Sequence, residues 1–144
     1  MFKNIAVTFE EYPEAKRAVQ SALELAQRLG ASLTVLVIAE PLSAYPSFTV
    51  SANPPALQTP RQDRAVFYEE ATKHITAQGD GAGLEISTHV LEGDTVHAVL
   101  DFVAANGVDL LIVGLHRHAL RISNLRSTVY SLTQELSCNV LGVH

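Results

Sequence analysis

The spacing of apolar residues changes several times along this chain. Ile5–Phe9 is a short apolar run without a helical period, which favours a buried strand. From Ala15 to Leu29 apolar residues recur every three or four positions, which predicts an amphipathic helix, and Gly30 follows as its C-terminal residue. The branched run Ser32–Ala39 predicts a second strand. The first forty residues therefore predict a strand–helix–strand crossover with parallel strands.

Both patterns stop over residues 40–62. This segment holds five of the chain's six prolines and shows no sustained period, so we expect a loop. It is long for a compact domain, in which connections usually have about 4–6 residues. Long loops of this kind are variable surface segments, lids or partner-binding segments, and the sequence leaves these interpretations open.

The alternation then resumes and continues to the C-terminus. In order, we expect a weaker helix over 64–78, a glycine-rich break at 79–83, a strand over 84–91, a helix over 96–103 ended at 106–107, a strand over 109–114, a helix over 125–136 and a strand over 139–143. Five strands alternating with four helices predict an α/β fold in a single domain, residues 1–144. The expected architecture is a doubly wound five-stranded parallel sheet with helices on both faces.

Composition narrows the function classes. With 144 residues and a formal net charge of −5, the chain is one acidic domain, which argues against nucleic-acid and membrane-surface binding. The apolar run after Lys3 is too short for a signal peptide, and no apolar run is long enough to span a membrane. The single cysteine, Cys138, has no disulfide partner within the chain. We therefore expect a cytoplasmic protein.

Side chains suited to metal binding or catalysis are scattered. His116 and His118 follow a predicted strand without a cysteine or paired acids nearby, so we expect no metal site. Cys138 precedes an apolar strand and has no adjacent cation, which favours an inert buried thiol. No serine lies in a nucleophile elbow, and we expect a protein without enzymatic activity. A small hydrolase remains an alternative, because active sites can assemble from distant loops.

One stretch is unusually basic for an acidic chain. Residues 110–134 contain no Asp or Glu but hold Arg117, Arg121, Arg126, His116 and His118. In open parallel sheets, ligands bind beyond the carboxyl ends of the strands, where this stretch would begin. Arginine binds phosphate through two parallel hydrogen bonds, which favours an anion site. The alternative is a solvated surface whose arginines pair with acids from other loops.

The order and spacing of several segments resemble universal stress proteins over essentially the whole chain. The segments that carry the resemblance are KNIAVTF, ALELAQRLGASLTVLVIAEP, LEGDTVHAVLDFVAANGVDLLIVGLH and SCNVLGVH. The resemblance implies an adenine nucleotide alpha hydrolase-like sheet with strand order 3-2-1-4-5, a role in stress-linked regulation, and a homodimer formed through residues 139–143. The chain itself adds that NVLGVH is apolar and would leave an exposed sheet edge unless it is paired.

The ATP-binding members of that family carry a glycine motif that this chain matches only in part. Their pattern is Gly, two residues, Gly, nine residues, then Gly followed by Ser or Thr. Its positions fall here on Gly114, Arg117 and Ser127, with Thr128 as the hydroxyl. Two of the three glycines, which would let backbone N–H groups approach a phosphate, are therefore absent. Glu10 takes the place of an aspartate that faces the nucleoside in the binders.

The resemblance thus implies a candidate nucleotide site for ATP or AMP. Near the base and ribose it places Thr8, Phe9, Glu10 and Ile38, and around the phosphates Val113, Gly114, Arg117, Ser127, Thr128 and Val129. Either Arg117 binds a phosphate or another anion, or its side chain blocks the site. We favour blocking, with weak or absent adenine-nucleotide binding. The remaining alternative is an interaction protein that uses the proline-rich loop or the dimer surface.

Overall fold

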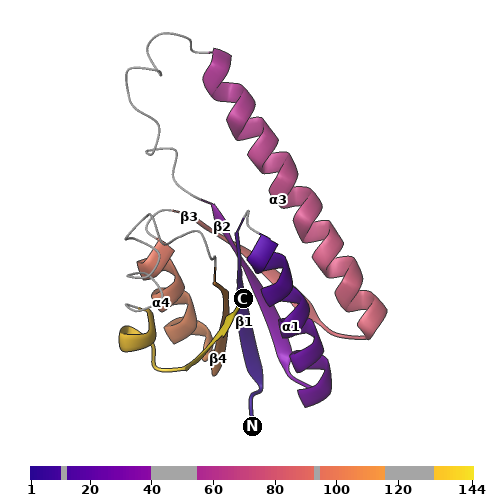
Figure 1. Cartoon of the computed structure of the whole chain (residues 1–144), viewed down its shortest axis with the longest axis vertical. Coiled ribbons are helices and arrows are strands. Elements are labelled where there is room, and N and C mark those ends of the chain that lie inside the picture. The colour runs from indigo at the N-terminus through magenta and orange to yellow at the C-terminus, as the bar shows by residue number, and fades with distance from the viewer. Residues whose placement is uncertain (11–12, 40–54, 93–94, 116–131) are drawn as a thin grey trace.

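The chain is represented by a computed structural model that describes residues 1–10, 13–39, 55–92, 95–115 and 132–144. Figure 1 shows the arrangement of its helices and strands. In chain order these are β1 (Asn4–Phe9), α1 (Pro13–Leu29), β2 (Ser32–Ala39), α3 (Pro55–Ala82), β3 (Ile86–Glu92), α4 (Thr95–Asn106), β4 (Leu110–Gly114) and β5 (Asn139–Val143).

The strands form one sheet in the order β3-β2-β1-β4-β5, and each neighbouring pair is parallel. The predicted doubly wound sheet and its strand order are therefore confirmed. The chain builds outward from β1 to β3 and then returns to place β4 on the other side of β1. The strand order reverses between β1 and β4, which is the place where open α/β sheets bind ligands.

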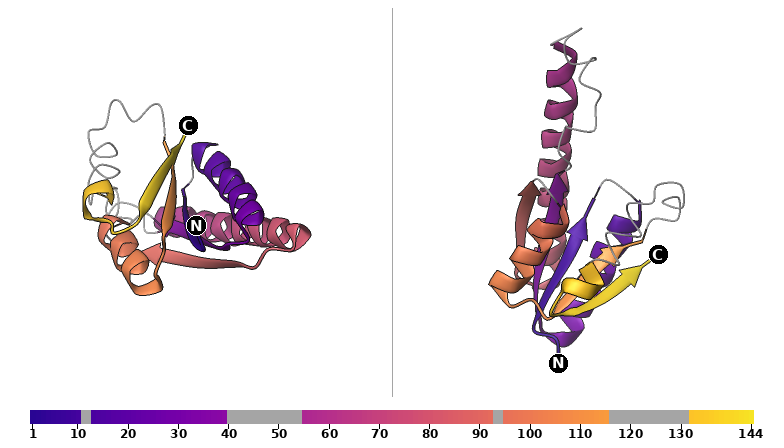
Figure 2. Two further views of the ribbon diagram at one scale, coloured as in Figure 1. Left: turned by 90° about the horizontal axis from the view of Figure 1, so that it is seen from below. Right: turned by 90° about the vertical axis from the view of Figure 1, so that its left-hand side faces the viewer.

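Helices cover both faces of the sheet, as predicted (Figure 2). On one face, α1 and α3 pack over Ile5, Val7 and Phe9 of β1 in a first hydrophobic cluster. On the other face, α4 and the helical residues 132–135 pack over a second cluster that includes Ala6 of β1. Alternate residues of each central strand thus enter opposite cores, because side chains along a strand point alternately to its two faces.

Helix α1 confirms its sequence pattern closely. Its buried stripe is mostly alanine, since Ala15, Ala18, Ala22 and Ala26 are all buried against the sheet. The helix ends where Gly30 adopts a positive φ of 62°, and the Ala31 N–H donates to the Ala26 carbonyl at 2.9 Å. This six-residue closure is a common helix end that needs a residue with a left-handed backbone, usually glycine.

Helix α3 differs from the prediction at both ends. It begins at Pro55, so the segment predicted as a loop over 40–62 is helical from residue 55 onward, and residues 40–54 lie outside the described part. Proline suits the first turn of a helix, where its missing N–H has no partner to lose. Figure 1 shows that the first part of α3 extends past the end of the sheet. An apolar stripe arises from packing, so a projecting helix segment need not carry the pattern that would predict it.

The C-terminal end of α3 also lies later than predicted. Gly79 and Gly81 were expected to break the helix, yet both are helical and the helix continues to Ala82. Gly83 ends it with a φ of 67°, and the Leu84 N–H donates to the Gly79 carbonyl at 2.9 Å. A glycine within a helix costs about 1 kcal/mol relative to alanine, and packing against β3 and α1 can offset that cost. The expected helix over 125–136 is described only from residue 132, where it is helical to 135.

Candidate functional site

The carboxyl ends of β1, β2 and β4 bring together part of the predicted site. The parallel register pairs Val7 of β1 with Ile112 of β4, which places Thr8 beside Val113 one step further along. Thr8 also pairs with Leu36 of β2, two residues before Ile38. Residues from three separate parts of the sequence therefore meet at the edge where the strand order reverses.

These residues do not all face the same side of the sheet. Ile38 and Val113 belong to the cluster on the α4 side, and Thr8 points the same way as its register partner Leu36. Thr8 is 8% exposed, so its hydroxyl is nearly covered. The Phe9 side chain instead enters the opposite cluster, between α1 and α3. Phe9 can therefore offer only its backbone to a ligand on the α4 side.

Gly114 has a structural role that its sequence position did not reveal. A Cβ added at this residue would lie 2.9 Å from the backbone atoms Glu14 C, Glu14 O and Ala15 N. The first turn of α1 therefore lies directly on the end of β4, and only a residue without a side chain permits this approach. The glycine in the first motif position is accounted for by helix packing, without a phosphate.

Glu14 is a charged residue of this region that sequence reasoning missed. It lies in the first turn of α1 and is only 8% exposed. The Arg17 guanidinium is 3.8 Å from its carboxylate and also donates to the backbone oxygen of His144 at 3.2 Å. A glutamate one residue after a helix-initiating proline is usually explained by the helix dipole. Because the helix dipole already explains a glutamate at this position, the sequence gives no sign that this turn contacts the end of β4.

Acidic side chains dominate the described part of this edge. Glu10 follows β1, Glu14 lies beside the end of β4, and Glu92 ends β3. Each carboxylate disfavours the approach of a phosphate, and the effect is greater where water is excluded. Arg17 offsets part of the charge of Glu14 through its contact.

The remaining predicted site residues lie outside the described part of the chain. These are Arg117, Ser127, Thr128 and Val129. The neighbouring basic residues Arg121, Arg126, His116 and His118 also lie outside the described part. The hypotheses that Arg117 binds or blocks a phosphate therefore remain predictions.

Other chemistry finds little support. Among the described residues, no group of three or more His, Cys, Asp or Glu side chains is placed to hold a metal ion. His89, in the middle of β3, contacts Phe102 of α4 with tilted rings whose centroids are 5.1 Å apart. The Cys138 thiol is half-buried, and this burial raises its pKa, which makes it a poor nucleophile at neutral pH. No helix in the described ranges is long and apolar enough to cross a membrane.

Comparison with known proteins agrees on one family. The sequence model of the Universal stress protein family matches residues 1–144. The chain is 23% identical over 144 residues to Universal stress protein A homolog 1 of Coxiella burnetii, covering 99% of this chain and 96% of that protein.

Solved structures show the same fold. Universal stress protein UspA from Lactobacillus plantarum superposes with a TM-score of 0.80 at 22% identity, covering 99% of this chain and 98% of that chain. An Arabidopsis thaliana universal stress protein family member, solved with AMP bound, gives a TM-score of 0.63 at 17% identity, with 98% and 90% covered.

Proposed function

The chain belongs to the universal stress protein family, and from that premise we propose that it is a non-enzymatic stress-response regulator that binds adenine nucleotides weakly. The ligand would lie at the carboxyl ends of β1, β2 and β4. Support comes from the Arabidopsis relative solved with AMP and from the match between Thr8, Glu10, Ile38 and Val113 and the strand ends where such ligands bind.

Weak binding is expected because α1 packs directly on Gly114. The backbone of Glu14 occupies the space on the α1 side of this glycine, so a phosphate cannot approach Gly114 from that side. The carboxylates of Glu10 and Glu14 add negative charge to the same edge. Every further phosphate of a nucleotide adds repulsion, so a monophosphate should bind at least as well as a triphosphate.

The base and ribose have better partners than the phosphates. Ile38 and Val113 give the α4 side an apolar base, and Thr8 places a nearly covered hydroxyl beside them. The Glu10 carboxylate, half-exposed just after β1, can accept hydrogen bonds from ribose hydroxyls. A charged acceptor of this kind contributes about 1.5–3 kcal/mol, which corresponds to a gain in affinity of roughly ten- to a hundredfold.

Calorimetric titration of the purified chain with AMP, ADP and ATP tests the proposal. We expect a dissociation constant for AMP between about 10 µM and 1 mM, with ATP binding no more tightly. ATP binding tighter than about 1 µM would overturn the weak-binding proposal. No heat from any of the three would remove nucleotide binding altogether and favour the interaction-protein alternative.

Substitutions of Glu10 and Arg117 then test whether each residue contributes to nucleotide binding. Glu10→Gln should weaken AMP binding about tenfold, because it removes a charged acceptor. Glu24→Gln, which changes an exposed carboxylate of α1 distant from the strand ends, is the matched control and should leave affinity unchanged. Arg117→Ala should leave affinity unchanged or raise it if the arginine blocks the site. A tenfold loss would instead assign Arg117 to phosphate binding.

The absence of enzymatic activity has its own test. ATP is incubated with the wild-type chain and with Thr128→Ala, and ADP release is followed over hours. Equal background rates are expected. Turnover by the wild type well above the variant would favour the hydrolase alternative.

We further propose a homodimer formed through β5. The strand order leaves β5 at the edge of the sheet, and Leu141 on it is 38% exposed. An apolar edge strand with unpaired backbone groups is a surface that proteins usually cover.

A further inference from the structure

A pocket lies between α1 and α3, on the face of the sheet opposite to Ile38 and Val113 of the strand-end site. Its volume is about 190 Å³. The lining consists of side chains from β1, α1 and α3: Phe9, Lys16, Val19, Gln20, Ala71, His74, Ile75 and Gln78. The helical spacing of these positions shows that facing stripes of the two helices form the walls.

The space exists because one residue in the α3 stripe is small. Tyr68 and Ile75 are large residues that pack into the core on this face, and Ala71 lies between them with only a methyl group. Tyr68 also ties α3 to the sheet, since its hydroxyl donates to the Ile38 carbonyl at 3.0 Å. This hydrogen bond anchors α3 to β2 about one helical turn before Ala71.

The pocket has an apolar floor and a polar rim. Phe9, Val19, Ala71 and Ile75 are buried or partly buried and form the floor. Lys16, Gln20, His74 and Gln78 are exposed and form the rim. No aspartate or glutamate belongs to the lining. The rim therefore offers an ammonium group, two carboxamides and an imidazole, of which the Gln78 carboxamide and the His74 imidazole are hydrogen-bonded to each other at 3.3 Å.

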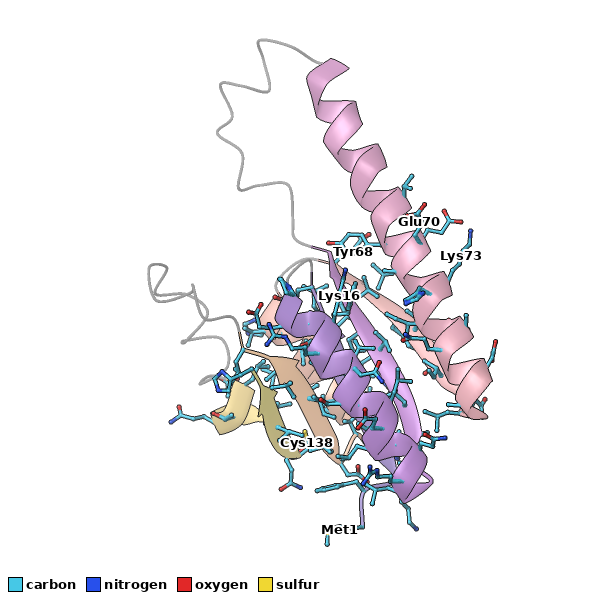
Figure 3. The ribbon with its side chains drawn as sticks, turned by 45° about the vertical axis from the view of Figure 1, so that its right-hand side comes forward. Met1, Lys16, Tyr68, Glu70, Lys73 and Cys138 are labelled. Atoms are coloured by element: carbon cyan, nitrogen blue, oxygen red, sulfur yellow. The ribbon has the colours of Figure 1, made fainter. Side chains whose placement is uncertain are left out.

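The acidic residue Glu70 of α3 points away from the pocket. Figure 3 shows Tyr68 on the side of α3 that faces α1, with Lys16 opposite, whereas Glu70 and Lys73 project from the other side of α3. Lys73 is paired with Glu69 at 2.9 Å. The charge of Lys73 is therefore compensated on the outer side of α3, whereas Lys16 supplies a cation on the pocket side.

We propose that this pocket binds a small amphipathic carboxylate, with a single ring or short chain on the apolar floor and the carboxylate beside Lys16. An apolar cavity of about 150 Å³ holds a molecule the size of benzene, so about 190 Å³ suits one ring with a small substituent. A nucleotide is much too large. The polar rim fits an anion because it combines one cation with several neutral donors.

The pocket is independent of the strand-end site. Phe9 points into the α1–α3 side, whereas Ile38 and Val113 face the α4 side. The two ligands would bind on opposite faces of the sheet, so success or failure of one proposal leaves the other unaffected.

The test is a titration of the full chain with benzoate, followed by two-dimensional ¹H–¹⁵N NMR. Benzyl alcohol, which keeps the ring without the charge, and acetate, which keeps the charge without the ring, are titrated in parallel. We expect benzoate to shift the amide signals of Phe9, Val19 and Ile75 with a dissociation constant of about 1 mM or lower. Benzyl alcohol should bind at least fivefold more weakly, and acetate should shift none of these signals.

Three variants locate the ligand. Ala71→Leu fills the empty space and should abolish the benzoate shifts. Lys16→Gln should weaken benzoate at least fivefold and leave benzyl alcohol unchanged. Lys73→Gln is the matched control, because it removes a lysine from the outer side of α3 that is already paired with Glu69, and should leave benzoate binding unchanged. Backbone spectra that retain their dispersion confirm that each variant is folded.

Several results would overturn the proposal. These are the absence of benzoate shifts in the wild type, shifts confined to Thr8, Ile38 and Val113, unchanged benzoate binding in Ala71→Leu, or an equal loss in Lys16→Gln and Lys73→Gln. The last result would mean that benzoate responds only to overall charge.

Discussion

The role of a single residue in this protein depends on which distant segment packs against it. Gly114 ends the apolar strand β4 and matches the first glycine of a nucleotide-binding motif. The sequence therefore suggested that its backbone contacts a phosphate. In the structure, the backbone of α1 lies against it. A glycine can be required by a ligand or by a neighbouring helix, and the sequence pattern is the same in both cases.

Substitution of Gly114 tests this role. Gly114→Ala should reduce the free energy of unfolding by about 1–3 kcal/mol, because its Cβ would press on the α1 backbone, which cannot rotate away. Urea denaturation followed by circular dichroism measures the change.

The matched control lies on the neighbouring strand. In Gly142→Ala the added Cβ meets the Leu115 side chain, nearest at its terminal Cδ1, which can change rotamer, so the loss should be clearly smaller. Equal stability of Gly114→Ala and the wild type would show that the first turn of α1 moves freely.

Cys138 gives a prediction about reactivity and pH. Burial raises the pKa of its thiol, so the reactive thiolate is scarcer at neutral pH than in an exposed cysteine. Alkylation by iodoacetamide at pH 7.5 should therefore be several-fold slower in the folded chain than in the urea-unfolded chain. The folded rate should keep rising above the pH at which the unfolded rate levels off. Equal rates in both states would contradict the effect of burial.

At the scale of elements, α3 shows where patterns mislead. Its glycines suggested a break at residues 79–83, but only Gly83 has the positive φ that ends the helix. Gly79 lies where a Cβ would overlap the Ile86 side chain, whereas Gly81 has open space. The two helical glycines therefore have different reasons for being tolerated.

Alanine substitutions at these two glycines should have opposite effects. Gly81→Ala should raise the free energy of unfolding by up to about 1 kcal/mol, because alanine favours the helix and meets nothing. Gly79→Ala should lower it, because Ile86 of β3 must leave its position and the Cβ would lie 3.2 Å from the Leu84 carbonyl oxygen. Thermal unfolding of both variants decides the matter, and a gain in stability for Gly79→Ala would contradict the packing argument.

At the scale of the whole molecule, β5 lies at the edge of the sheet, where the proposed homodimer would form. Leu141→Lys should raise the dissociation constant of the proposed homodimer at least tenfold, because a charge would have to be buried or displaced at the edge. Leu29→Lys changes another exposed leucine, 45% exposed at the end of α1, and should leave assembly unchanged. Sedimentation equilibrium measures both. A wild-type chain that remains monomeric at about 100 µM would contradict the proposal.

The sequence predicted most of the fold because the relevant signals are local or periodic. The alanine stripe of α1, the branched strands β1, β2 and β4, and the glycine at residue 30 each follow from interactions within a few residues or from a repeated face. The start of α3 at Pro55 was missed because a helix that projects beyond the sheet has no packing face to impose a period.

The candidate site was predictable only in outline. Thr8, Ile38 and Val113 could be placed at the strand ends through the resemblance to universal stress proteins, and the parallel register brings them to one edge of the sheet. The contribution of Glu14 and the true neighbour of Gly114 could not, since the pairing of a helix turn with a strand end some hundred residues later leaves no mark in either segment.

The amino-acid sequence by itself thus determined the order of elements and the parallel sheet, because local propensity and hydrophobic period specify them. Its residue identities also determine the acidic net charge and the incomplete match to the family's glycine motif. Only the tertiary structure decided which face Phe9 enters, what Gly114 touches, and that Ala71 leaves a pocket between α1 and α3. These features depend on contacts between distant segments. Such contacts are set by the packing of whole helices on the sheet, which no single stretch of sequence contains.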